Sequence, residues 1–258
     1  MKFDYISILA SGDCPCACDF CIGKGTGHGF PTFAPMHDIL SFLEENKGKT
    51  SEVSISGSST DPLFTNSTSI ECIIKAARSY KYKVVSLHTH VFNQRTKDVV
   101  SMVDELCVSI NNADDLRAFK ALNLKLDNVR VSSVLTSKNV EWLNSGELFK
   151  LGVDRFTIRK NVFEKDVDMG FKLPEGSLFK CKIFGNDIFM TKEGQAIALW
   201  NYSETNEKCN AKYLWADGLE RNQDYWNVFY SSVLNPGVAI GDYRVFEKYG
   251  IKIKRDGK

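Results

Sequence analysis

Short β-rich segments alternate with segments of helical periodicity over the first 160 or so residues of this 258-residue chain. Six segments rich in strand-forming residues are predicted as strands, at residues 5–9, 52–56, 83–88, 105–110, 129–135 and 155–158. Five intervening segments are predicted as helices, at residues 36–46, 69–78, 95–102, 113–122 and 139–149. This strict alternation predicts an α/β fold whose parallel strands are joined by right-handed crossovers.

Such a series of βα units fits either a doubly wound sheet or an incomplete barrel. In both architectures, ligands bind at the edge where the strands end. After about residue 160 the pattern changes, because residues 179–200 alternate apolar and polar side chains around turn sequences. That pattern predicts an antiparallel hairpin or meander. An aromatic-rich tail follows, so we expect a core at residues 1–160 and an extension at residues 161–258.

Composition restricts the partners and the location of the protein. The hydrophobic fraction is 43%, the charged fraction is 25%, and the net charge is +1. A near-neutral chain has no global field that would attract nucleic acid or a membrane, although residues 252–255 (K-I-K-R) are locally basic. The apolar run at the amino terminus is too short for a signal peptide, and no later stretch is long enough to span a bilayer. We therefore expect a cytoplasmic protein.

Four of the eight cysteines lie between Cys14 and Cys21, directly after the first predicted strand. In a reducing compartment, clustered thiols are more often metal or redox ligands than disulfides. One spacing stands out: Cys14-x3-Cys18-x2-Cys21, with Phe20 before the last cysteine. Three thiolates on one loop can hold three irons of a [4Fe–4S] cluster and leave the fourth iron open to a small ligand. Structural zinc usually needs two separated ligand pairs, and the sequence has no second C-x-x-C.

This C-x3-C-x-Φ-C arrangement, on a loop after the first strand of a βα series, resembles that of the radical S-adenosylmethionine (SAM) superfamily. The resemblance covers residues 5–159. It implies a partial (βα)6 TIM-like barrel, a [4Fe–4S] cluster on Cys14, Cys18 and Cys21, and SAM bound to the open iron. Cys16 departs from the motif, because it lies inside the x3 spacer. A cluster with four cysteine ligands would serve only electron transfer and would strain this short loop, so we interpret Cys16 as a bystander or structural thiol.

A second match lies at the end of the second predicted strand, in S-I-S-G-S-S-T-D-P-L-F. In the superfamily this strand usually ends in a Gly-Gly-Glu-type motif that binds the amino group of SAM. Ser59, Thr60 and Asp61 take those positions here, and the Asp61 carboxylate can accept a hydrogen bond from an ammonium group. The glycines are replaced, however. The alternative is an ordinary Ser-rich turn before a helix that is capped by Thr65 or Asn66.

Polar residues at other strand ends, together with the aromatic residue of the cysteine motif, complete the cofactor site that the resemblance implies. Ribose and carboxylate contacts are expected near the fourth to sixth strand ends, where an arginine can form a bidentate pair with the SAM carboxylate. For each strand-end residue, the alternative is a solvated strand end or a capping residue. The candidates are Phe20, His88, Ser109, Asn111, Ser132 and Arg159.

The resemblance implies that SAM is cleaved reductively to a 5′-deoxyadenosyl radical, which abstracts a hydrogen atom from the substrate. This would make the protein an oxidoreductase, lyase or transferase that receives electrons from flavodoxin or ferredoxin. The extension at residues 161–258 is expected to cover the barrel opening. No auxiliary-cluster domain is evident, and this favours a compact substrate such as a nucleotide or small metabolite.

Three alternatives differ in function. The first is a peptide-modifying radical SAM enzyme of the epimerase or cyclase type, with Cys181 or Cys209 as the hydrogen-atom donor. The second is an iron–sulfur electron carrier without catalytic activity. The third is a zinc-stabilised binding or scaffold protein, which would need a second ligand pair.

Overall fold

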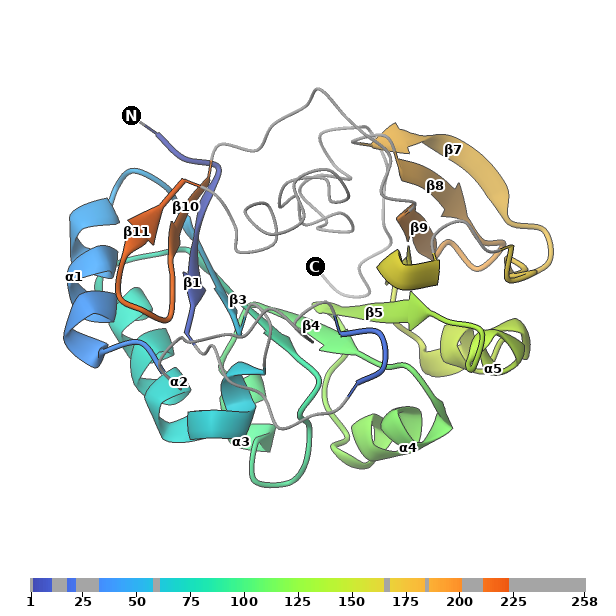
Figure 1. Ribbon diagram of the computed structural model, residues 1–258, viewed down its shortest axis with the longest axis horizontal. Coiled ribbons are helices and arrows are strands. Elements are labelled where there is room, and N and C mark those ends of the chain that lie inside the picture. Colours follow the sequence, from blue (N-terminus) through green and yellow to red (C-terminus); the bar gives the residue numbers. More distant parts are fainter. Residues whose placement is uncertain are drawn as a thin grey trace. The chain divides into compact units, whose positions relative to one another are not determined.

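The computed structural model describes residues 2–10, 18–21, 33–57, 61–164, 168–183, 186–200 and 211–222 (Figure 1). The chain divides into two compact units. Unit 1 consists of Met1–Leu106 and Lys208–Gly237, and unit 2 of Cys107–Glu207 and Val238–Lys258. Strand β4 (Glu105–Ser109) contains the boundary between them. None of the helices in the described ranges is both long and apolar enough to cross a membrane.

The sheet of unit 1 has the strand order β11-β10-β1-β2-β3. Its strands are β1 (Tyr5–Leu9), β2 (Glu52–Ser56), β3 (Val84–Thr89), β10 (Ala211–Leu214) and β11 (Glu220–Arg221). The strands β10, β1, β2 and β3 run parallel, and β11 pairs antiparallel with β10. The helices are α1 (Met36–Asn46), α2 (Pro62–Ser79) and α3 (Lys97–Val100). The predicted alternation of parallel strands and helices is therefore confirmed in this unit.

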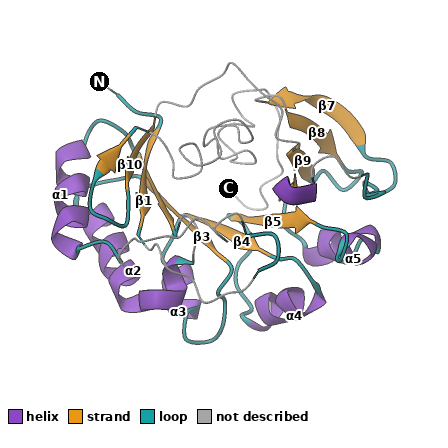
Figure 2. Ribbon diagram, viewed as in Figure 1, coloured by secondary structure: helices purple, strands orange, loops and turns teal. Residues whose placement is uncertain are grey.

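The two faces of this sheet differ in chemistry. Ser7 pairs in register with Ser54, and Ser54 pairs with Ser86, so three small polar residues lie side by side on one face. The alternate positions of these strands, such as Ile8 and Ile55, are fully buried and aliphatic. Figure 2 shows α1 and α2 together on one side of these strands. The aliphatic face packs against the helices, and the serine face is left for polar contacts.

Helix α2 begins earlier than the predicted range of 69–78, because Asp61 caps it. The Asp61 carboxylate accepts a hydrogen bond from the N–H of Leu63 at 2.9 Å, and Pro62 occupies the first helical position. An acidic N-cap followed by proline is a strong start signal for a helix. Thr65 and Asn66, the alternative caps that the sequence suggested, lie inside the helix, so that part of the prediction is wrong.

In unit 2 the strands follow the order β5-β6-β9-β8-β7. They are β5 (Val129–Leu135), β6 (Arg155–Lys160), β7 (Leu178–Ile183), β8 (Asn186–Met190) and β9 (Ala196–Trp200). The β7–β8–β9 segment is the predicted antiparallel meander. Strand β9 also pairs parallel with β6 and so extends the parallel ladder.

The helices of unit 2 are short. They are α4 (Ala113–Ala121), α5 (Val140–Asn144) and two 3-10 helices, η1 (Leu148–Leu151) and η2 (Val162–Glu164). The sequence predicted one helix over 139–149, but the chain turns at Gly146, which has a φ of 74°. Glycine adopts this left-handed conformation without steric cost, and the helical segment is therefore split at that residue.

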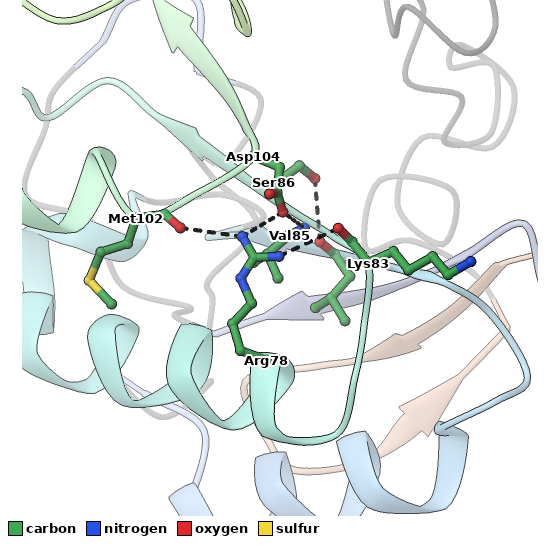
Figure 3. Close-up of polar contacts among 7 residues, drawn as sticks. Arg78, Lys83, Val85, Ser86, Met102 and Asp104 are labelled. Carbon is green, nitrogen blue, oxygen red and sulfur yellow. Dashed lines mark hydrogen bonds and ion pairs between the residues drawn. The ribbon is translucent and has the colours of Figure 1, made fainter.

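An ion pair stabilises the amino end of β3 (Figure 3). The Arg78 guanidinium at the end of α2 lies 2.6 Å from the Asp104 carboxylate, which accepts the N–H of Val85 at 2.7 Å. The same guanidinium donates to the carbonyl oxygens of Met102, at 3.4 Å, and Lys83, at 3.5 Å. Arg78 therefore joins the end of one helix to the starts of two strands.

We expect Arg78→Ala to lower the free energy of unfolding by about 1.5 kcal/mol, because it removes a half-exposed ion pair and two hydrogen bonds. Urea unfolding monitored by circular dichroism measures this loss. Lys75→Ala is the matched control on the same helix, since the ion pair that it removes, with Glu71, is exposed and lies within α2. A loss as large for Lys75→Ala as for Arg78→Ala would contradict the stabilising role of the Arg78 network.

Candidate functional site

The cysteine-rich segment is fixed at both ends to the carboxyl end of β1. The N–H of Ala10 donates to the carbonyl of Ser56 at 2.9 Å, which continues the β1–β2 ladder. The N–H of Ala34 donates to the carbonyl of Ala10, also at 2.9 Å. Ala10 and Ala34, which flank the cysteine-rich segment, are therefore joined at the carboxyl end of β1, on the edge where α/β folds bind ligands.

Two of the predicted cluster ligands lie in a tight turn. The N–H of Cys21 donates to the carbonyl of Cys18 at 3.0 Å, which closes a four-residue turn. Cys18, Phe20 and Cys21 are half-buried, and Cys18 is a free thiol. Two thiols in one turn are part of the donor set that an iron–sulfur cluster requires.

The other predicted ligand, Cys14, lies outside the described residues, as does Cys16. Within the described ranges, no group of three or more His, Cys, Asp or Glu residues could hold a metal ion. The cluster on Cys14, Cys18 and Cys21 therefore stays a prediction.

Asp61 lies at the start of α2 and is 5% exposed. Its carboxylate accepts the N–H of Leu63 and the hydroxyl of Thr89, each at 2.9 Å, and the N–H of Val91 at 3.1 Å. The N–H of His90 is a further donor. Burial raises the pKa of Asp61 above its usual value, and these hydrogen bonds oppose that rise. The carboxylate thus connects the start of α2 to the end of β3.

The structure shows fewer contacts for the other predicted site residues of unit 1. Ser59 and Thr60 lie outside the described residues. His88 is half-buried and lies on the serine face of β3, two residues beyond Ser86. The ring of His90 stacks on Phe92, with 6.2 Å between centroids.

In unit 2, Asn111 follows β4 and presents one buried donor. Its Oδ1 accepts the N–H of Val134 at 2.8 Å, and this contact fixes the orientation of the amide because a backbone N–H can only donate. The residue is 5% exposed, and within the described part of the chain its Nδ2 has no partner. A buried donor without a protein partner is a candidate contact for a bound ligand.

Asn139 holds this end of unit 2 together, and the sequence analysis did not identify it. Its Nδ2 donates to the carbonyls of Asn111, at 3.0 Å, and Val134, at 2.8 Å. Its Oδ1 accepts the N–H of Thr136 at 2.9 Å. Asn139 occupies the N-cap position of α5, but its side chain makes no capping bond. An asparagine at the start of a predicted helix was the available signal, and it indicates a cap rather than a cross-link between strand ends.

Ser132 and Arg159 lie on one face of neighbouring strands. Ser132 pairs in register with Thr157, and Val134 pairs with Arg159. Paired residues and their i+2 neighbours lie on the same face of a sheet. Ser132 and Arg159 therefore share a face and are two residues apart along the strand direction. The Nε of Arg159 is buried and, among the described residues, has no hydrogen-bond partner.

The end of β4 lies beside β5 in the same unit. The N–H of Ile110 donates to the carbonyl of Ser132 at 2.9 Å, and this bond places the half-buried Ser109 next to β5. Ser109, Asn111 and Arg159 therefore lie near the carboxyl ends of their strands, whereas Ser132 lies in the middle of β5, beside the end of β4.

Of the two candidate hydrogen-atom donors, only Cys181 lies within the described residues. It is half-buried on β7, and burial raises the pKa of its thiol above the usual value, against the opposing effect of Lys180. A raised pKa favours the protonated thiol, which is the form that a hydrogen-atom donor uses.

Comparison with known proteins gives similarity to solved structures only, since no protein-family model and no curated protein sequence matches the chain. Streptococcus suis SuiB bound to precursor peptide SuiA has a TM-score of 0.44 and 17% identity, over 62% of this chain and 40% of that chain. Native anSMEcpe with bound AdoMet and Kp18Cys peptide has a TM-score of 0.47 and 14% identity, over 61% of this chain and 51% of that chain. Native anSMEcpe with bound AdoMet and Cp18Cys peptide has a TM-score of 0.45 and 12% identity, over 61% of this chain and 50% of that chain. This chain thus spans about half the length of these structures or less, and at such TM-scores the likeness does not identify it.

Asn139→Ala removes three buried hydrogen bonds, and we expect it to lower the free energy of unfolding by about 3 kcal/mol. The control is Asn112→Ala, which removes the exposed N-cap of α4 and should cost about 1 kcal/mol. Guanidinium unfolding of both variants measures the difference. Equal losses would show that Asn139 acts as an ordinary helix cap.

Proposed function

We propose that the chain is a radical SAM enzyme. The observation that carries the proposal is the Cys18–Cys21 turn of the C-x3-C-x-Φ-C motif, in a segment that hydrogen bonds fix to the carboxyl end of β1. When bound, a [4Fe–4S] cluster and SAM supply the 5′-deoxyadenosyl radical that removes a hydrogen atom from a substrate. An electron carrier and a scaffold protein need no such edge in a series of parallel strands.

The chain's own residues would hold and orient the two cofactors. Cys14, Cys18 and Cys21 are the proposed ligands of the cluster, and Phe20 packs beside it. In unit 2, the Asn111 Nδ2 is a buried donor that suits an oxygen atom of SAM, and the Arg159 guanidinium suits its carboxylate.

Fewer observations support the other proposed SAM contacts. They are Ser59, Thr60, His88, Ser109 and Ser132. The residues at 161–258 are proposed to cover the opening of the barrel core and keep water from the radical. Flavodoxin or ferredoxin would supply the electrons.

For the substrate, a peptide is proposed in preference to a nucleotide or small metabolite. Cys181 supports this choice, because it offers a half-buried thiol, with a pKa that burial raises, as the group that returns a hydrogen atom to a substrate radical in an epimerase. SuiB and anSMEcpe hold peptides in their solved structures. Because these TM-scores are below 0.5, the two structures carry no argument about the substrate of this chain. The proposal of a peptide substrate therefore depends on Cys181.

An anaerobic assay tests the enzyme class. After reconstitution with iron and sulfide, reduction with dithionite and addition of SAM, we expect 5′-deoxyadenosine to be detected by mass spectrometry. The triple variant Cys14/Cys18/Cys21→Ala should form none, whereas Cys72→Ala, which changes an exposed cysteine of α2, should behave as the unaltered protein does. A cluster that forms without SAM cleavage would favour an electron carrier, and one bound zinc without iron would favour the scaffold protein.

Arg159→Met tests the proposed carboxylate contact. We expect the dissociation constant of SAM to rise about 30-fold, which corresponds to the loss of about 2 kcal/mol. Stability should change little, because the buried Nε of Arg159 has no hydrogen-bond partner among the described residues. Arg117→Met, which removes an exposed arginine paired with Asp114, is the control and should leave SAM binding unchanged. Calorimetric titration of the cluster-loaded proteins measures both constants, and unchanged binding in Arg159→Met would remove Arg159 from the site.

A further inference from the structure

Protein donors converge on both oxygens of the Asp61 carboxylate. An ionised carboxylate offers about four lone-pair sites. The N–H groups of Leu63, His90 and Val91 donate to its two oxygens. The Thr89 hydroxyl lies within hydrogen-bond distance of both oxygens and of the Val91 carbonyl oxygen. An ammonium group at Asp61 would compete with these donors, and displacing the N–H of Leu63 or His90 would leave that group without its acceptor.

The donors to Asp61 come from two places in unit 1, the start of α2 and the end of β3. Leu63 belongs to the start of α2, whereas Thr89 is the last residue of β3, and His90 and Val91 follow it. The donors on the β3 side lie 28 to 30 residues further along the chain than Asp61. The carboxylate therefore closes a long-range contact in addition to capping its own helix.

Thr89 reinforces this arrangement. Its hydroxyl lies 2.9 Å from both oxygens of Asp61, and its oxygen accepts the N–H of Val91, also at 2.9 Å. The side chain of Thr89 is buried. The two residues thus form one buried network at the carboxyl end of β3, which we call the Asp61 clamp: Asp61, Leu63, Thr89, His90 and Val91.

We propose that Asp61 is a positioning residue that holds the end of β3 against the start of α2, and that the SAM ammonium binds another acceptor. This inference rests on the proposed function where it concerns SAM. The sequence pattern had suggested instead that the Asp61 carboxylate binds the SAM ammonium directly. The clamp acts through the backbone of residues 89–91, which directly follow His88, the proposed cofactor contact on the same strand.

Three variants separate positioning from direct contact. Asp61→Asn replaces one acceptor oxygen with a donor, whereas Thr89→Val keeps the carboxylate and removes one of its donors. Asp104→Asn is the matched control, because Asp104 also accepts a β3 backbone N–H, that of Val85, but at the opposite end of the strand. Thr89→Val keeps the test decisive if Asp61→Asn does not fold.

Amide hydrogen exchange of the cluster-loaded protein without SAM tests the clamp itself. We expect exchange at His90 and Val91 to accelerate about tenfold in Asp61→Asn and to accelerate in Thr89→Val, but to stay unchanged in Asp104→Asn. Unchanged exchange at these two amides in both clamp variants would overturn the proposal.

Titration with SAM and with its deamino analogue tests the role toward the cofactor. We expect both clamp variants to bind both compounds more weakly and to keep the affinity ratio of the unaltered protein within about twofold. Loss of the preference for SAM in Asp61→Asn alone would show direct contact with the ammonium and overturn the proposal. If the unaltered protein binds neither compound, the proposed function and the cofactor part of this inference fail together, while the exchange result still decides whether the clamp exists.

Discussion

The carboxyl ends of the parallel strands depend on buried side chains that replace the backbone ladder where it stops. Backbone N–H groups beyond the last paired residue need other acceptors, since a buried donor without one costs free energy. In unit 1, Asp61 accepts the N–H groups of His90 and Val91. In unit 2, Asn111 accepts the N–H of Val134, and Asn139 accepts that of Thr136. Each unit therefore has a defined strand-end edge on which a ligand site can be built.

The cysteine segment depends on the same edge. Its two ends meet at Ala10, which donates to β2 and accepts from Ala34. A segment anchored in this way can bring thiols to the strand ends without a domain of its own. On the serine face of β1, β2 and β3, small polar residues take the place of the branched aliphatic layers that fill a closed barrel.

Local signals in the sequence predicted much of the fold, and non-local contacts account for most of what was missed. The limits of β1, β2, β5 and α1 agree with the prediction, because periodicity and flanking turn residues define them. The parallel pairing of β9 with β6 and of β10 with β1 depends on residues far apart in the chain, which periodicity cannot reveal. For the same reason, the sequence identified Asp61 as a site residue but not its partners. The residues of the candidate site in unit 2 were chosen as polar strand ends, and the one that orders them, Asn139, resembled an ordinary cap.

Mössbauer spectroscopy of the reconstituted, 57Fe-enriched protein tests the central claim most directly, namely that three cysteines hold a cluster with one open iron. The account predicts a [4Fe–4S] spectrum in which addition of SAM shifts one iron of the four and leaves the other three unchanged. Four irons that do not respond to SAM, or a protein that binds zinc and no iron, would contradict it.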